Sequence, residues 1–228
     1  MKAEEIKVVV SEQHTVSALL LRPADAWAMY VFAHGAGAGM RHPFMESMSR
    51  TLASAGVATL RYQFPYTEED RSRPDPPVVL EATVRAAVDA ADNAMGLPLF
   101  AGGKSMGGRM TSQAYSQEPL QGVRGLIFFG FPLHAPRRST ISRASHLDRV
   151  SVPMLFLQGT RDDLANLDLM KSVCAALGSR ATLHIVEGGD HSFKVLKRSG
   201  RDETAVMGEL RDTAVAFMRK LADKEQPV

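Results

Sequence analysis

The stretch "LPLFAGGKSMGGRM", residues 97–110, decides how this 228-residue chain is interpreted. It contains Gly-Lys-Ser, which ends a phosphate-binding loop, and Gly-x-Ser-x-Gly, the turn that exposes a nucleophilic serine. The phosphate loop would need a glycine at position 98, which is Pro98 and stands inside the preceding apolar run. The nucleophile turn needs a strand before it and a helix after it, and "LPLFAG" and "MGGRMTSQAYS" fit both. The stretch therefore favours an exposed nucleophile, Ser105, over a nucleotide-binding loop.

The residues around Ser105 suit a sharp turn. Glycines stand two positions before and two positions after it, where a Cβ would collide with neighbouring backbone. The serine would then lie at the N-terminus of a helix. Backbone N–H groups and the helix dipole favour a developing negative charge at that place.

A serine nucleophile needs a base, and the base needs a carboxylate that orients it. The strand expected at 154–157 leads into "QGTRDD", which offers Asp162, and the strand at 181–186 leads into "EGGDHSF", which offers His191. Because parallel strands place their carboxyl ends at one edge of a sheet, we expect the three side chains to meet there. Asp163 remains an alternative to Asp162, since loop registers slip by one residue. Asp190 is expected to cap the turn before the base.

Short apolar runs alternate with helical patterns along the whole chain, which is typical of βαβ units and a mostly parallel sheet. We predict one α/β domain over residues 1–228, with about eight strands and five or six helices. The first two strands lack an intervening helix and should pair antiparallel at one edge, while residues 65–77 should form a loop. The strands are expected at 6–10, 16–21, 29–33, 57–62, 97–101, 123–129, 154–157 and 181–186.

The composition excludes several classes of protein. The net charge is only +2, from 27 basic and 25 acidic side chains, and the arginines are scattered, so no nucleic-acid partner is expected. No apolar stretch approaches the ~18 residues of a membrane span, and the N-terminus lacks the apolar run of a secretory signal. A cytoplasmic location is therefore predicted. The single cysteine, Cys174, excludes an internal disulfide, and no residue spacing suits zinc, so we expect neither metal nor organic cofactor.

The strings "HGAGAG", "RYQFPY", "GGKSMGGR", "FPLHAP", "QGTRD" and "GGDHSF" resemble the α/β-hydrolase superfamily, and within it the small, lidless, dienelactone-hydrolase-like group. The branch they resemble includes bacterial predicted hydrolases and the hydrolase-like domain of a histone-acetyltransferase complex subunit. The resemblance extends from about residue 6 to residue 221. It implies an α/β-hydrolase fold without a lid domain, and an oxyanion hole made by the backbone amides of Ala36 and Met106.

Together these features predict a carboxylesterase-like serine hydrolase that cleaves a small ester through an acyl-enzyme. Ser105 would attack, His191 would act as the base and Asp162 would orient it. The candidates for substrate contact are His34, Lys104, Tyr62, Phe64 and His134. Of these, His34 is also expected to support the oxyanion loop, and Lys104 either attracts an anionic substrate or stabilises the turn. The alternative is a non-catalytic binding or scaffold protein that retains the fold; the oligomeric state is left open.

Overall fold

The computed structural model describes residues 1–222, so the last six residues of the predicted domain, 223–228, lie outside the described part. Eight strands form one sheet in the order β1-β2-β4-β3-β5-β6-β7-β8. The pairs β1–β2 and β2–β4 are antiparallel and all the others are parallel, which confirms the predicted α/β class and its antiparallel edge. The strands are β1 (Glu4–Val9), β2 (Thr15–Leu21), β3 (Ala28–Ala33), β4 (Val57–Tyr62), β5 (Leu99–Lys104), β6 (Val123–Phe129), β7 (Met154–Gly159) and β8 (Ala181–Val186).

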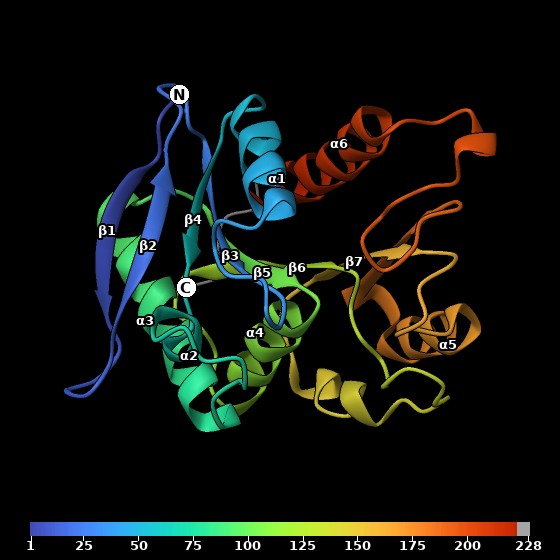
Figure 1. Ribbon diagram of the computed structural model, residues 1–228, viewed down its shortest axis with the longest axis horizontal. Helices are drawn as coiled ribbons and strands as arrows, with labels where there is room; N and C mark the ends of the chain where they lie inside the picture. Colours follow the sequence, from blue (N-terminus) through green and yellow to red (C-terminus); the bar gives the residue numbers. More distant parts are fainter. Residues whose placement is uncertain (223–228) are drawn as a thin grey trace.

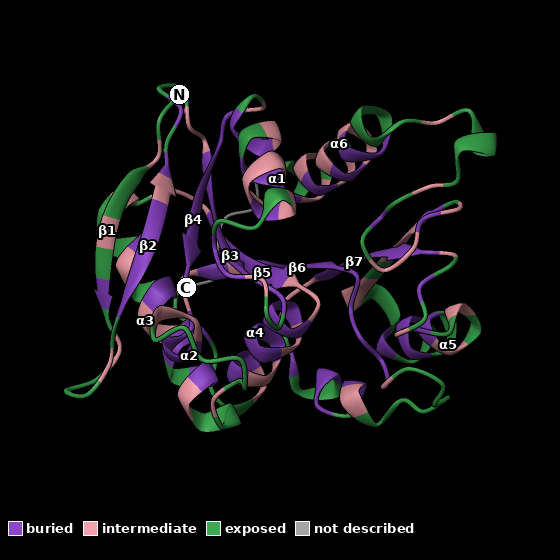
Figure 2. Cartoon of the chain, viewed as in Figure 1, coloured by how far each residue is buried: buried purple, intermediate pink, exposed green. Residues whose placement is uncertain are grey.

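Helices cover both faces of the sheet (Figure 1). Helices α1 and α6 pack on one face, and α3, α4 and α5 pack on the other. Every residue of the inner strands β3 and β4 is buried, whereas the edge strand β1 is largely exposed (Figure 2). Burial on two faces explains the continuous apolar runs in the sequence. The helices are α1 (Pro43–Ala53), α2 (Pro65–Glu68), α3 (Pro77–Met95), α4 (Met106–Gln117), α5 (Leu167–Leu177) and α6 (Glu203–Ala222).

Helix α3 illustrates how the sequence pattern becomes packing. Pro77 occupies its first turn, where a missing N–H costs nothing, and Gly96 ends it in the left-handed region at φ 57°. The expected inner face is confirmed, because all five of its predicted positions are buried against the sheet. These positions are Leu80, Val84, Ala87, Val88 and Ala91.

Strand β5 differs from the prediction in a way that bears on the site. It begins at Leu99 rather than at position 97 and continues through both glycines to Lys104. Gly102 and Gly103 pair with β3, and a Cβ on Gly102 would overlap the Ile127 carbonyl group of β6. The glycines therefore belong to the sheet, and no loop remains at this point to wrap a phosphate.

Two connections also differ from simple loops. Residues 65–68, expected to be irregular, form the short helix α2, which Pro65 begins. The connection between β6 and β7 contains two short 3-10 turns, η1 (Ser142–Ala144) and η2 (Leu147–Arg149). It carries no lid domain, as the resemblance implied.

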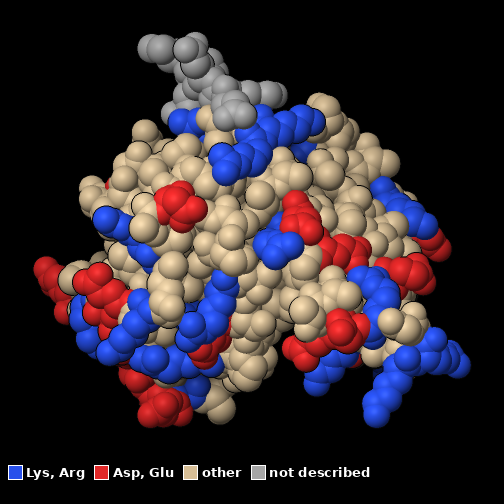
Figure 3. Space-filling model, turned by 90° about the horizontal axis from the view of Figure 1, so that it is seen from above, with Lys and Arg blue, Asp and Glu red and all other residues tan. Residues whose placement is uncertain are grey.

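The distribution of charged side chains on the surface agrees with the scattered charges in the sequence. On the face formed by α1 and α6, basic and acidic side chains are interspersed (Figure 3). Within residues 1–222, no helix combines the length and the apolar character required to cross a bilayer.

Candidate active site

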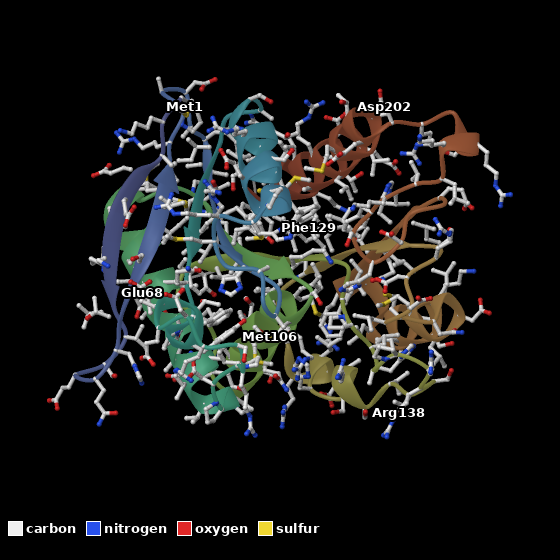
Figure 4. All side chains as sticks on the ribbon, in the orientation of Figure 1. Met1, Glu68, Met106, Phe129, Arg138 and Asp202 are labelled. Carbon is white, nitrogen blue, oxygen red and sulfur yellow. The ribbon has the colours of Figure 1, made fainter. Side chains whose placement is uncertain are left out.

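Ser105 lies in a strained turn between β5 and α4, with φ 52° and ψ −118°. A non-glycine residue with positive φ is uncommon and costs energy that the surroundings must supply. Gly103 and Gly107 permit the turn, since a Cβ on either would lie 2.5 Å from the carbonyl oxygen of Ala33. The Ser105 N–H also donates to the Phe129 carbonyl at 3.1 Å. In Figure 4, the labelled Met106 marks the start of α4 after this turn, and the labelled Phe129 marks the end of the neighbouring strand β6.

The three residues predicted to cooperate are in contact. The Ser105 hydroxyl lies 2.8 Å from Nε2 of His191, and Nδ1 of His191 lies 2.7 Å from Oδ2 of Asp162. The Asp162 side chain has no exposed surface, whereas a quarter of the imidazole is exposed. With Nδ1–H donating to the carboxylate, Nε2 is left to accept the serine proton.

Asp162 is held by more than the imidazole. The side-chain amide of Gln158 donates to Oδ2 at 2.5 Å, and the N–H of Leu164 donates to Oδ1 at 2.8 Å. Three donors therefore hold this buried carboxylate in one orientation. The sequence interpretation missed Gln158, although it stands at the end of β7 in the quoted string "QGTRD".

The neighbouring carboxylates behave differently. Asp163 is exposed, so the acid in contact with the base is Asp162. As expected, Asp190 caps the turn: its Oδ1 accepts the N–H groups of Ser192 at 2.8 Å and Lys194 at 2.9 Å. These bonds lie within the loop after β8, which carries the base.

The loop after β3, residues 34–40, passes directly beside the nucleophile. A Cβ built on Gly35 would lie 3.6 Å from Cβ of Ser105. Within the described residues 1–222, the backbone amides of Ala36 and Met106 donate to no protein acceptor. Ala36 is exposed and Met106 begins α4, so both amides are available to an incoming group.

Side chains from β4 and α2 hold this loop in place. Arg61 donates to the Met40 carbonyl at 3.1 Å, and Oε1 of Gln63 accepts the Met40 N–H at 2.8 Å. The Tyr66 hydroxyl accepts the N–H of Gly37 at 3.1 Å. The segment "RYQFPY", which contains the expected substrate contacts Tyr62 and Phe64, therefore supports the oxyanion loop.

His34 also belongs to this support. Its Nδ1 bonds to the Gly35 carbonyl at 2.7 Å, and its Nε2 accepts the N–H of Phe64 at 3.3 Å. Burial lowers the pKa of this imidazole from 6.5 to about 4, so it is neutral near pH 7. The ring is fully buried, which corrects its assignment as a substrate contact.

Three more of the predicted substrate contacts are engaged by other residues of the protein. Tyr62 and Phe64 are 1% and 0% exposed, because their rings pack edge to face within the core below β4. His134 borders a surface hollow of about 700 Å³, but its Nε2 accepts the N–H of Asn166 at 2.9 Å. Tyr62 and Phe64 are therefore core residues, and His134 supports the loop that contains Asn166.

The ammonium group of Lys104 is engaged by partners within the protein. It donates to the His191 carbonyl at 2.6 Å and lies 5.9 Å and 5.6 Å from the ring centres of Phe44 and Phe193. Burial lowers its pKa from 10.5 to about 8. These contacts agree with the alternative that Lys104 stabilises the turn, while attraction of an anionic substrate stays a prediction.

The sheet order and the strained serine turn define an α/β-hydrolase fold. The chain belongs to the α/β-hydrolase domain family, which matches residues 26–219. Dienelactone hydrolase from Anabaena variabilis superposes with a TM-score of 0.78 at 21% identity, covering 97% of this chain and 100% of that one. A lidless α/β serine hydrolase from Xanthomonas campestris superposes with a TM-score of 0.74 at 16% identity, covering 99% and 98%. The chain is thus a small, lidless, dienelactone-hydrolase-like α/β-hydrolase.

A protein from Mycobacterium tuberculosis, provisionally named a phosphoribosyl transferase, is similar in sequence. It is 26% identical over 200 residues, which cover 85% of this chain and 43% of that protein. The chain therefore spans less than half of the length of this relative.

Proposed function

We propose that this protein is a serine hydrolase that cleaves a small carboxylic ester through an acyl-enzyme. The observation that carries the proposal is the pair of hydrogen bonds that connects Ser105 to His191 and His191 to the buried Asp162. Such an arrangement is needed for nucleophilic catalysis, in which a weak hydroxyl nucleophile requires an oriented base. A protein that only binds would gain nothing from the strained backbone at the serine.

In the proposed mechanism, Ser105 attacks the ester carbonyl while Nε2 of His191 takes the hydroxyl proton. Asp162 stabilises the imidazolium that forms and keeps Nδ1 protonated. The amides of Ala36 and Met106 donate to the oxyanion of the tetrahedral intermediate. His191 then delivers the proton to the leaving alcohol. Water next attacks the acyl-enzyme while His191 takes its proton, and His191 returns that proton to Ser105 as the acid leaves.

The surroundings of the serine favour a small substrate. The connection between β6 and β7 forms no lid, and Ala36 and Gly37 are exposed beside the nucleophile. A shallow site of this kind offers little apolar surface to a long acyl chain. We therefore propose short-chain or otherwise compact esters as the substrate class.

A fluorophosphonate probe, which phosphonylates activated serines, tests the proposal. We expect the wild-type protein to be labelled, and Ser105→Ala to remain folded without being labelled. Ser112→Ala is the matched control on the same helix, because the Ser112 hydroxyl bonds to Nε2 of His146 at 2.8 Å but is fully buried. This control should keep the label. Folded wild-type protein that resists the probe would overturn the proposal and favour the non-catalytic scaffold.

The name of the mycobacterial relative does not lead to a second proposal. A phosphoribosyl transferase must hold a phosphorylated ribose, yet the glycines that suggested a phosphate loop are part of strand β5. The shared region also covers less than half of that relative. Ester hydrolysis therefore remains the function that the geometry supports best.

A further inference from the structure

Lys104 connects two parts of the site that are far apart in the sequence. It precedes the nucleophile directly, yet its ammonium group donates to the backbone carbonyl of His191, 87 residues further on. The ammonium group also lies 5.9 Å from the ring centre of Phe44 and 5.6 Å from that of Phe193, and these two rings stack on each other. A long, mobile side chain is thereby fixed in one direction.

The neighbouring backbone makes room for this contact. A Cβ on Gly130 would lie 3.1 Å from Nζ of Lys104 and 3.5 Å from Cε1 of His191. Gly130 has φ +69° and donates its N–H to Leu157 at 2.8 Å, so it is held close to the base. A Cβ at 130 would therefore crowd Nζ of Lys104 and contact the imidazole.

The loop that carries the base is itself strained. Phe193 adopts φ 62°, although it is not glycine, and it is only 4% exposed. The Asp190 side chain accepts two backbone N–H groups within this loop, and the Lys104 bond connects the loop to the strand that precedes the nucleophile. A strained loop keeps its geometry only where contacts outside the loop determine it.

We propose that Lys104 is a positioning residue for the base: it fixes the main chain of His191 relative to Ser105 and so sets the distance across which the proton moves. The inference rests on the proposed hydrolase function. Because Lys104 and Ser105 are consecutive, the segment that presents the nucleophile also holds the base. Catalytic geometry must be kept within about 0.5 Å, which one direct bond between the two segments can provide.

If Lys104 served only to stabilise the fold, its replacement would lower Tm together with kcat. Within residues 1–222, Lys104 forms no ion pair, and burial of its charge lowers its pKa. An apolar side chain of similar length removes the cost of burying this charge, which offsets the lost bond to the His191 carbonyl and the lost attraction to Asp162 and Asp190, so we expect little change in stability. Loss of positioning and loss of stability can therefore be separated by one substitution.

Lys104→Met removes the donor and keeps an unbranched side chain of similar length beside the two aromatic rings. A misplacement of about 1 Å at a catalytic group can cost on the order of 100-fold, so we expect kcat to fall by about 10- to 100-fold. KM should stay within about twofold and Tm should change little. Lys194→Met, an exposed lysine of the same loop, is the matched control and should behave as wild type.

Two results would overturn the proposal: kcat of Lys104→Met within twofold of wild type, or a fall in kcat accompanied by an equal loss of Tm. Proton NMR separates this from failure of the proposed function, because the Nδ1–H that bonds to Asp162 gives a far-downfield resonance. If wild type hydrolyses no ester, the function fails and the resonance still decides the role of Lys104. Its disappearance in folded Lys104→Met supports positioning, and its retention refutes it.

Discussion

Replacing Asp162 with asparagine changes one atom of the site but reverses its hydrogen bonding. Both carboxylate oxygens accept from donors: Oδ1 from the N–H of Leu164, and Oδ2 from Gln158 and His191. The asparagine NH2 group must therefore face a donor in either orientation. Facing Leu164 it meets a backbone N–H, and on the other side it meets the Gln158 amide and the imidazole.

These contacts set the expected losses of activity and of stability in Asp162→Asn. With the NH2 group toward His191, the imidazole must give up the Nδ1–H tautomer and then presents a proton, not a lone pair, to Ser105. In a serine protease this change lowers kcat by about 10⁴, which corresponds to about 5 kcal/mol in the barrier. An unsatisfied buried donor costs about 1–3 kcal/mol of stability, or several degrees of Tm for a chain of this length.

The assay is hydrolysis of p-nitrophenyl acetate, with thermal unfolding measured on the same samples. Asp163→Asn is the control, because Asp163 is adjacent in sequence but exposed. We expect kcat/KM to fall by about 10⁴ for Asp162→Asn and to change less than twofold for Asp163→Asn. Activity of Asp162→Asn within tenfold of wild type would show that the observed contact to His191 does not orient the base.

Three further predictions follow from the same contacts. Burial lowers the pKa of His34 and His146 from 6.5 to about 4, so the stability they contribute is complete above pH 6.5 and is lost as the pH falls towards 4, by up to about 3 kcal/mol each; equal urea midpoints at pH 7.5 and 4.5 would contradict this. Gly103→Ala should lower Tm and abolish probe labelling, because its Cβ would lie 2.5 Å from a carbonyl oxygen of β3; a folded, labelled variant would refute it. Tyr66→Phe removes the acceptor of the Gly37 N–H and should lower kcat by about tenfold with KM unchanged, whereas a change in KM alone would assign the hydroxyl to substrate binding.

The local features of this protein could be predicted from its amino-acid sequence. The apolar runs specified eight strands, and the five buried positions of α3 followed from helical spacing. Pro98 excluded the phosphate loop, and the glycines around Ser105 indicated the sharp turn. These features could be predicted because each depends on a few consecutive residues and on the fixed periods of helix and strand.

Which side chains face the core and which stay accessible depends on tertiary packing and could not be predicted from the sequence. Tyr62 and Phe64 stand at the end of a strand, as pocket residues do, but helices cover both faces of β4 and bury their rings. Lys104 follows the same rule: its partner lies 87 residues away, in a loop whose position depends on the packing of β8 and α1. A side chain takes its direction from the register and packing of its neighbours, and those neighbours are set by the fold as a whole rather than by adjacent residues.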